Sequence, residues 1–167
     1  MKSLSFVVSH IGSFGQSILA HILASLVFRI FRFRRDLVLA NLEKAFGSKM
    51  SIEERTKVGY RSVFHFVLTL VEFLGSSRGD ISKNVKFEGE QNLLEALKKG
   101  QGVYVLCCHL GSWEAMGAAM NKEYGPTYVI VKKVGSESMN RFVCEQRDKN
   151  EFKIIERKGR GSASISI

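Results

Sequence analysis

The stretch Cys108-His109-Leu110-Gly111-Ser112-Trp113-Glu114 joins two segments of different character. The residues before it, 103–107, form an apolar run with β-branched and aromatic side chains, and those after it, 115–120, are mostly small. This order predicts a buried strand, a tight loop and then a helix. His109 then lies where the strand ends and Glu114 where the helix begins. A loop of this length can fold the carboxylate back onto the imidazole.

A histidine beside a carboxylate has a definite chemical use. Imidazole accepts protons well near neutral pH, and a carboxylate on its second nitrogen fixes the tautomer and stabilises the imidazolium. Such a pair can take the proton from a substrate hydroxyl, whose oxygen then attacks an activated acyl group, so no protein nucleophile is needed. The same spacing also fits a histidine that is capped by a nearby polar group at a strand end.

From residue 85 onward, apolar runs and helical patterns alternate. We expect strands at 85–89, 103–107, 128–131 and 152–155, with helices at 92–99, after Glu114 and at 136–147. This alternation predicts an α/β domain with a mixed, largely parallel sheet. Sites in such sheets lie at the carboxyl ends of the strands, where both His109 and Lys132 fall.

The N-terminal segment 4–31 is mostly apolar and has no charged residue before Arg29. It is long enough to cross a bilayer, and the basic run after it favours a cytoplasmic location for the chain that follows. Small or polar residues recur every four positions along it: Ser9, Ser13, Ser17, His21, Ser25 and Arg29. This stripe fits an anchor helix that packs on protein, and it also fits a helix that lies in the membrane interface.

The next two segments are predicted helices. Residues 35–46 combine leucines with basic residues, which favours contact with the phosphates of an anionic membrane surface. Ser51-Ile-Glu-Glu54 is a capping box and predicts the start of a helix that runs to about Leu74.

Composition limits the classes of protein that remain. The chain has 167 residues, enough for one domain with a core, and a formal net charge of +9, which favours anionic partners. Its three cysteines form neither a disulfide framework nor a zinc spacing, and we expect Cys107 and Cys108 to be small core residues. Because neighbouring strand residues point to opposite faces, a nucleophilic Cys108 beside His109 is disfavoured.

The segment His109-Leu-Gly-Ser-Trp-Glu114 resembles the His-x-x-x-x-Glu signature of membrane acyltransferases that esterify glycerolipids and glycolipids. Its surroundings are similar to those of the bacterial lipid A biosynthesis lauroyl and myristoyl transferases, whose segment often reads His-x-Gly-x-Trp-Glu. The basic helix from Arg35 to Phe46-Gly47 and the following 51–55 also look like that family. The resemblance runs from about Arg35 to Lys158.

This resemblance implies a reaction and its partners. The donor is an acyl-acyl carrier protein, and the acceptor is a hydroxyl of a phosphorylated glucosamine lipid, the lipid A precursor. His109 is the general base and Glu114 its orienter, and the backbone N–H groups of the Gly111-Ser112 loop are candidate donors to the oxyanion. No metal, bound cofactor or nucleic acid is implied. The expected location is the bacterial inner membrane, with the catalytic domain on the cytoplasmic face.

The resemblance also assigns basic residues to the substrate. Lys132, Arg147 and Arg157 are expected to contact phosphates of the acceptor lipid or of the acyl carrier. Lys132 stands where the family commonly has Arg, which keeps the charge and loses the bidentate fork. Asn140 stands where family members often have Asp. A solvated basic surface is the alternative interpretation of the cluster.

We expect residues 1–33 to be a membrane anchor helix and residues 34–167 an acyltransferase domain. Members of the family continue with further strands and helices, so the resemblance implies the N-terminal portion of that fold, with the C-terminal part missing.

Two other functions remain open. The chain could be an inactive, membrane-tethered remnant that binds anionic lipid or acyl carrier protein. Charge alone also suggests a nucleic-acid binder, which no zinc spacing, aromatic RNA-binding motif or helix-turn-helix pattern supports.

Overall fold

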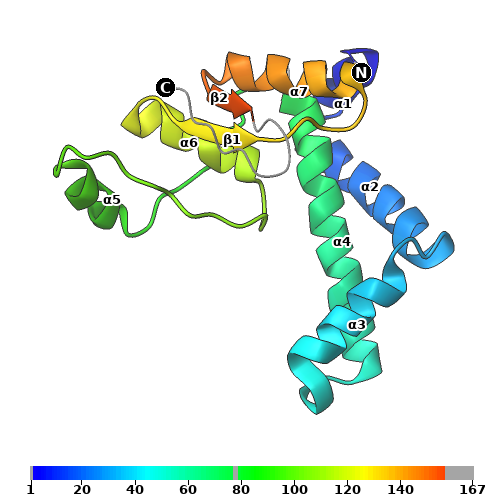
Figure 1. Ribbon diagram of the computed structural model, residues 1–167. Coiled ribbons are helices and arrows are strands. Elements are labelled where there is room, and N and C mark those ends of the chain that lie inside the picture. Colours follow the sequence, from blue (N-terminus) through cyan, green and yellow to red (C-terminus); the bar gives the residue numbers. More distant parts are fainter. Residues whose placement is uncertain (1, 77–78, 157–167) are drawn as a thin grey trace. The chain divides into compact units, whose positions relative to one another are not determined.

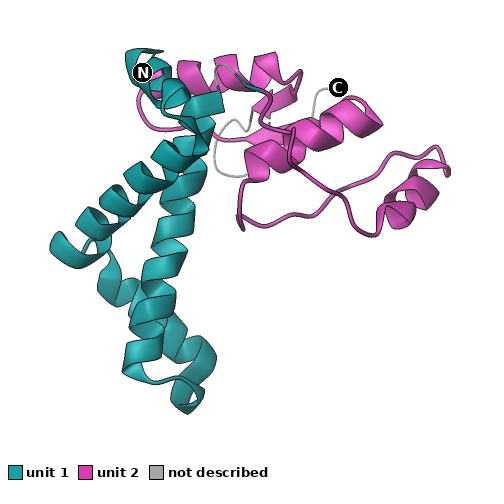
Figure 2. Ribbon diagram, turned by 180° about the vertical axis from the view of Figure 1, so that it is seen from behind, with its two compact units in different colours: residues 1–79 teal, residues 80–167 magenta. Residues whose placement is uncertain are grey.

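A computed structural model describes residues 2–76 and 79–156 of the chain. It consists of two compact units, residues 1–79 and residues 80–167, which Figure 2 shows in different colours. Each unit is described by itself below. The sequence predicts that a membrane anchor ends at residue 33 and that a catalytic domain begins at residue 34. The two compact units do not test this functional division, which stays a prediction.

Unit 1 is entirely helical in its described residues. In chain order it contains α1 (Lys2–His10), α2 (Gly12–Ser25), the π-helical turn η1 (Leu26–Ile30), α3 (Arg35–Phe46), the 3-10 turn η2 (Gly47–Lys49) and α4 (Ile52–Gly75). The predicted N-terminal helix is interrupted at Gly12, whose φ of +60° a helix does not permit. The predicted bounds of α3 are confirmed. The capping box that starts α4 is also confirmed, since the Ser51 side chain accepts from the Glu54 N–H and the Glu54 carboxylate accepts from the Ser51 N–H.

Small and polar side chains make the close helix contacts of unit 1, beside an apolar cluster around Val8, Ala20 and Val71. In Figure 1, α1 and α2 lie along α4, with α3 packed at the end of α4 where that helix begins. Ala20 and Ala24 are fully buried (0% exposed), and Ser5 Oγ donates to the Leu74 carbonyl at 2.6 Å. A Cβ atom on Gly59 would lie 3.1 Å from Val38, so α3 and α4 approach closely there. Small residues therefore permit the close contacts between these helices.

Large apolar side chains of unit 1 face outward instead. On α2, Phe14 is 80% exposed, and Ile18 and Ile22 follow on the same helix face at intervals of four. The helical segments Gly12–Ile30 and Ile52–Gly75 are long and apolar enough to cross a membrane. Small residues between helices and large apolar residues outside them are typical of helices that pack within a bilayer. The arrangement therefore favours membrane attachment of this unit.

The predicted polar stripe lies beside the buried face of α2. The face that meets α4 carries Ala20, Ala24 and Phe28, while His21 and Ser25 reach α4 at its edge. Tyr60 on α4 places its hydroxyl 3.2 Å from His21 Nδ1 and 3.1 Å from Ser25 Oγ. This part of the stripe packs on protein, as predicted for an anchor.

Unit 2 mixes helices with a small sheet. It contains α5 (Glu90–Leu97), α6 (Trp113–Tyr124), β1 (Tyr128–Val131), α7 (Glu137–Lys149) and β2 (Lys153–Glu156). The strands pair in parallel, with Tyr128 opposite Lys153 and Val131 opposite Glu156, and α7 forms the crossover between them. The prediction of parallel pairing joined by a helix is therefore confirmed for residues 128–156.

The larger sheet that the sequence predicts is not present in the described residues. Segments 85–89 and 103–107 form no strand there, so the predictions at both places are wrong. A strand needs a hydrogen-bonded neighbour, and only β1 and β2 are paired in the described part of the chain. Cys107 and Cys108 are exposed rather than core residues, because no layer covers this segment, in which Leu106 is 100% exposed.

The interior of unit 2 is built on α6. Its buried positions are small, and they lie near two buried aromatic residues, Phe142 of α7 and Phe152 before β2. A Cβ atom on Gly117 would lie 2.7 Å from the Phe152 ring, so the ring rests directly on the helix backbone. The Asn121 side chain accepts from the Thr127 N–H at 2.8 Å and donates to the Asn150 carbonyl at 3.0 Å. One amide thus joins α6 to the starts of both strands.

Candidate active site

His109 lies on an exposed segment just before α6. Its ring centroid is 4.8 Å from that of Trp113, in an edge-on arrangement at 69°. The contact joins the loop to the first residue of the helix, and it leaves the exposed imidazole accessible to a substrate. Gly111 has a φ of +68°, which glycine adopts without the steric cost that a Cβ atom brings. The tight loop predicted between His109 and the helix is therefore present.

Glu114 stands in the first turn of α6 and is nearly buried, with 11% of its side chain exposed. Arg147, in the last turn of α7 and 15% exposed, donates to both of its oxygens: Nε to Oε2 at 3.2 Å and Nη2 to Oε1 at 2.5 Å. Each charge stands at the helix end whose dipole favours it. A two-pronged pair of this kind fixes the carboxylate in position and orientation.

The structure therefore joins Glu114 to Arg147 rather than to His109. In residues 79–156, no hydrogen bond or ion pair links the His109 ring to the Glu114 carboxylate. The sequence prediction had placed Arg147 on a substrate phosphate, and the residue that it contacts here is Glu114. The two residues are 33 positions apart, so no local sequence signal identifies them as a pair.

The helix start offers hydrogen-bond donors. Ser112 is the N-cap residue of α6, and its carbonyl accepts from the Met116 N–H at 3.0 Å. Its hydroxyl makes no capping bond, and within the described part of the chain the buried Oγ has no hydrogen-bond partner. First-turn N–H groups lack acceptors inside their own helix and carry the positive end of its dipole. The first turn of α6, directly after the Gly111-Ser112 turn, can therefore stabilise negative charge.

Of the remaining predicted residues, the structure describes Lys132 and Asn140. Lys132 directly follows β1 and is exposed, as expected for a residue at the carboxyl end of a strand. Asn140 accepts from the Val134 N–H at 3.0 Å, which ties the segment after Lys132 to α7. The predicted phosphate contact of Arg157 lies outside the described residues.

Comparison with known proteins identifies a family. The family model described as bacterial lipid A biosynthesis acyltransferase matches residues 4–165. No curated protein and no solved structure matches the chain. The family match covers both units and nearly the whole sequence.

Proposed function

The chain belongs to the bacterial lipid A biosynthesis acyltransferase family, and from this we propose that it moves a fatty acyl chain from acyl-acyl carrier protein to a hydroxyl of a phosphorylated glucosamine lipid. Membership makes the chain an acyltransferase of lipid A biosynthesis. The donor, the acceptor and the residues that carry out the reaction are our proposal. One observation carries it: an exposed histidine on a glycine turn stands directly before a helix that begins with a fixed carboxylate.

His109 is the general base in this proposal. Its imidazole takes the proton from the acceptor hydroxyl while the oxygen attacks the thioester carbonyl carbon, which gives a tetrahedral oxyanion. The C–S bond then breaks, an ester remains, and the thiolate of the carrier takes the proton back from the imidazolium. Backbone N–H groups at Gly111 and Ser112 stabilise the oxyanion, since donors fixed before the reaction need no reorganisation.

Glu114 acts as a positioning residue in this mechanism. The two hydrogen bonds from Arg147 hold the carboxylate at the start of α6, five residues after His109 in the sequence. Its negative charge at the start of the helix that follows His109 favours the imidazolium that forms during proton transfer. Arg147 therefore acts on the reaction through Glu114, and Lys132 and Arg157 are the residues that we assign to substrate phosphates.

We place the protein at the bacterial inner membrane with unit 2 on the cytoplasmic face. The outward apolar side chains of α2 and the two long apolar helices support membrane attachment. The basic run from Arg29 to Arg35 supports the cytoplasmic side, because positive residues accumulate at that end of a span. The acceptor is itself an anionic lipid and is found in the same membrane surface.

The test is acyl transfer by membranes that contain the full chain. Labelled acyl-acyl carrier protein and a phosphorylated glucosamine lipid are supplied to wild type, H109A and H10A. General-base loss typically costs 100-fold or more, so H109A should fall by at least about 100-fold. H10A removes another exposed imidazole, outside the site, and should retain wild-type turnover.

Two outcomes would contradict the proposal. Retained turnover in H109A rules out this base. If no variant transfers acyl chains while all remain folded in the membrane, the chain is instead an inactive, membrane-tethered protein, and its binding of anionic lipid or acyl carrier protein is then its function.

A further inference from the structure

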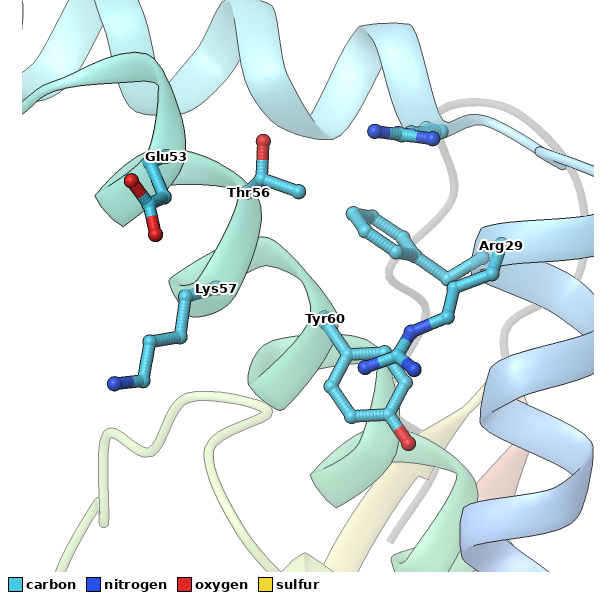
Figure 3. Close-up of a pocket in the computed structure, with 7 residues that line it drawn as sticks. Arg29, Glu53, Thr56, Lys57 and Tyr60 are labelled. Carbon is cyan, nitrogen blue, oxygen red and sulfur yellow. The ribbon is translucent and has the colours of Figure 1, made fainter.

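Unit 1 contains a cavity of about 360 Å³ between η1, α3 and α4, which Figure 3 shows in close-up. Its lining includes three cations and one carboxylate beside two aromatic rings: Arg29, Arg35, Lys57, Glu53, Phe28 and Tyr60. We name this cavity the basic pocket. None of these residues belongs to the site around His109. The excess of cations suits an anionic ligand.

Two of the cations are held in place by aromatic rings. Arg29 Cζ lies 4.3 Å from the centroid of Tyr60, and Arg35 Cζ lies 5.3 Å from the centroid of Phe28. A guanidinium on a ring face keeps its N–H edges available for another acceptor. No salt bridge occupies either arginine within the described residues. Ligand binding therefore costs little additional ordering of these side chains.

The aromatic rings are themselves fixed. The Tyr60 hydroxyl is bonded to Ser25 and His21 on α2, and Phe28 is buried against Gly59 of α4. Arg29 belongs to the π-helical turn Leu26–Ile30, and such turns are found frequently at functional sites. Arg29 meets the Tyr60 ring from this turn.

The pocket lies where a membrane surface would meet the protein. One apolar segment ends at Ile30 and the other begins at Ile52, and the contact between Arg29 and Tyr60 places the end of the first beside the first three turns of the second. At the ends of membrane-spanning helices the surrounding layer consists of lipid headgroups, and basic residues there contact their phosphates.

We propose that the basic pocket binds the phosphate group of an anionic membrane lipid. The guanidinium groups of Arg29 and Arg35 donate to the phosphate oxygens, and Lys57 adds positive charge from α4. The half-buried Tyr60 ring offers apolar surface to the glycerol and the first acyl carbons. This second lipid site is independent of the acyl-transfer reaction, so it remains even if His109 proves inactive.

A soluble lipid tests the pocket without the general attraction of a charged membrane. The full chain in a neutral detergent is titrated with dihexanoyl phosphatidylglycerol by calorimetry, for wild type, R29Q/R35Q and R32Q/R34Q. The control pair removes the same charge from the link between η1 and α3, outside the pocket lining. The pocket pair should bind at least about tenfold more weakly, because charge-assisted bonds to phosphate are lost. The control pair should change less than about twofold.

Equal weakening in the two pairs would overturn the pocket, since it would show attraction by net charge alone. Inorganic phosphate and glycerol phosphate form the second arm of the test. Retention of bound dihexanoyl phosphatidylglycerol in the presence of an equal concentration of inorganic phosphate or glycerol phosphate supports a lipid ligand. Equal displacement by inorganic phosphate overturns that assignment.

A variant that is expected to bind the lipid more tightly keeps the proposal testable even if the arginine variants misfold, because misfolding would lower the affinity rather than raise it. E53Q removes the carboxylate from the pocket lining, and its affinity should rise by about threefold because a repulsive charge is lost. D36N makes the same change of charge on α3, outside the lining, and should leave affinity unaltered. Unchanged affinity in E53Q would contradict the proposed position of the phosphate.

Discussion

At the residue scale, the pair Glu114–Arg147 governs what substitutions near His109 do. Both side chains are nearly buried and share two hydrogen bonds, so removal of one partner leaves the other charge buried without compensation. Activity changes in single variants therefore need a stability measurement beside them.

We predict that E114Q and R147M each lower the free energy of unfolding by about 3 kcal/mol, since a buried charge loses its partner. The double variant E114Q/R147M should lose clearly less than the sum of the two, because it leaves no unpaired charge. Urea unfolding of the four proteins, followed by the fluorescence of Trp113, measures this. Additive losses would mean that the two charges do not interact.

Gly117 is a second position where one atom decides the packing. In G117A the new Cβ atom would meet the Phe152 ring at 2.7 Å, and the ring must move. We expect a loss of about 1–3 kcal/mol, the usual cost of overpacking. Thermal unfolding measures it, and F152L should recover part of the loss in the G117A background. If F152L recovers none of the lost stability, the strain caused by G117A does not lie at the Phe152 ring.

At the element scale, Asn121 connects α6 to the starts of both strands. N121A leaves the Thr127 N–H and the Asn150 carbonyl without their partner, at about 1–3 kcal/mol for each buried group. N92A is the matched control, because Asn92 bonds only the exposed Gly89 carbonyl. Hydrogen exchange should speed up at residues 127–131 and 153–156 in N121A and remain unchanged in N92A. Protection that persists in N121A would contradict this role.

Local signals explain which elements could be predicted from the sequence. The bounds of α3 and the start of α4 follow from leucine spacing and from the Ser51–Glu54 capping box, which act within a few residues. Ser136, which caps α7 by accepting from the Met139 N–H, is a signal of the same kind. The break at Gly12 was missed because a lone glycine within an apolar run is compatible with a helix.

Non-local contacts explain what could not be predicted. The run 103–107 has the composition of a buried strand, yet a strand forms only beside a neighbour, and composition does not supply one. The same limit holds at the site: His109, its glycine turn and the helix that begins at Trp113 were predicted, while the partner of Glu114 was not. Arg147 reaches Glu114 from a different helix, 33 residues further along the chain, and that approach follows from the fold of the whole unit.

At the scale of the whole molecule, the acid stability of unit 2 has a local origin. Hydrogen bonds from the Ser82 side chain and then from Lys122 lower the pKa of Asp80 from 3.8 to about 2. A carboxyl group whose pKa is lower in the folded state contributes stability above its unfolded pKa, and loses it as pH falls through the folded value. This contribution is therefore complete above about pH 4 and disappears toward pH 2.

The variant D80N lacks this titration. We expect the difference in melting temperature between wild type and D80N to be constant from pH 7 to pH 5 and to shrink between pH 4 and pH 2. K122Q, which removes a weaker cause of the shift, should give a smaller change. A difference that does not vary with pH would show that the Asp80 charge has no part in stability.

Membrane attachment is a property of unit 1 as a whole. The variant F14S/I18S/I22S removes the exposed apolar face of α2, and we expect it to leave the membrane pellet on an alkaline carbonate wash. L94S/L97S removes comparably exposed leucines from α5 in unit 2 and should remain in the pellet. Equal release of both variants would contradict attachment through α2.

The layering of unit 1, with small residues at its closest helix contacts and large apolar residues exposed on α2, gives a specific pattern of mutational tolerance. In a saturation library, inner positions such as Ala20, Ala24 and Gly59 should reject every larger residue, including apolar ones. Outer positions such as Phe14 and Ile18 should accept any apolar residue and reject charged ones. Side-chain volume would thus be selected at the helix contacts and hydrophobicity at the exposed positions. Scoring rules calibrated on water-soluble proteins, which favour polar residues on the surface, would therefore misrank substitutions at Phe14 and Ile18.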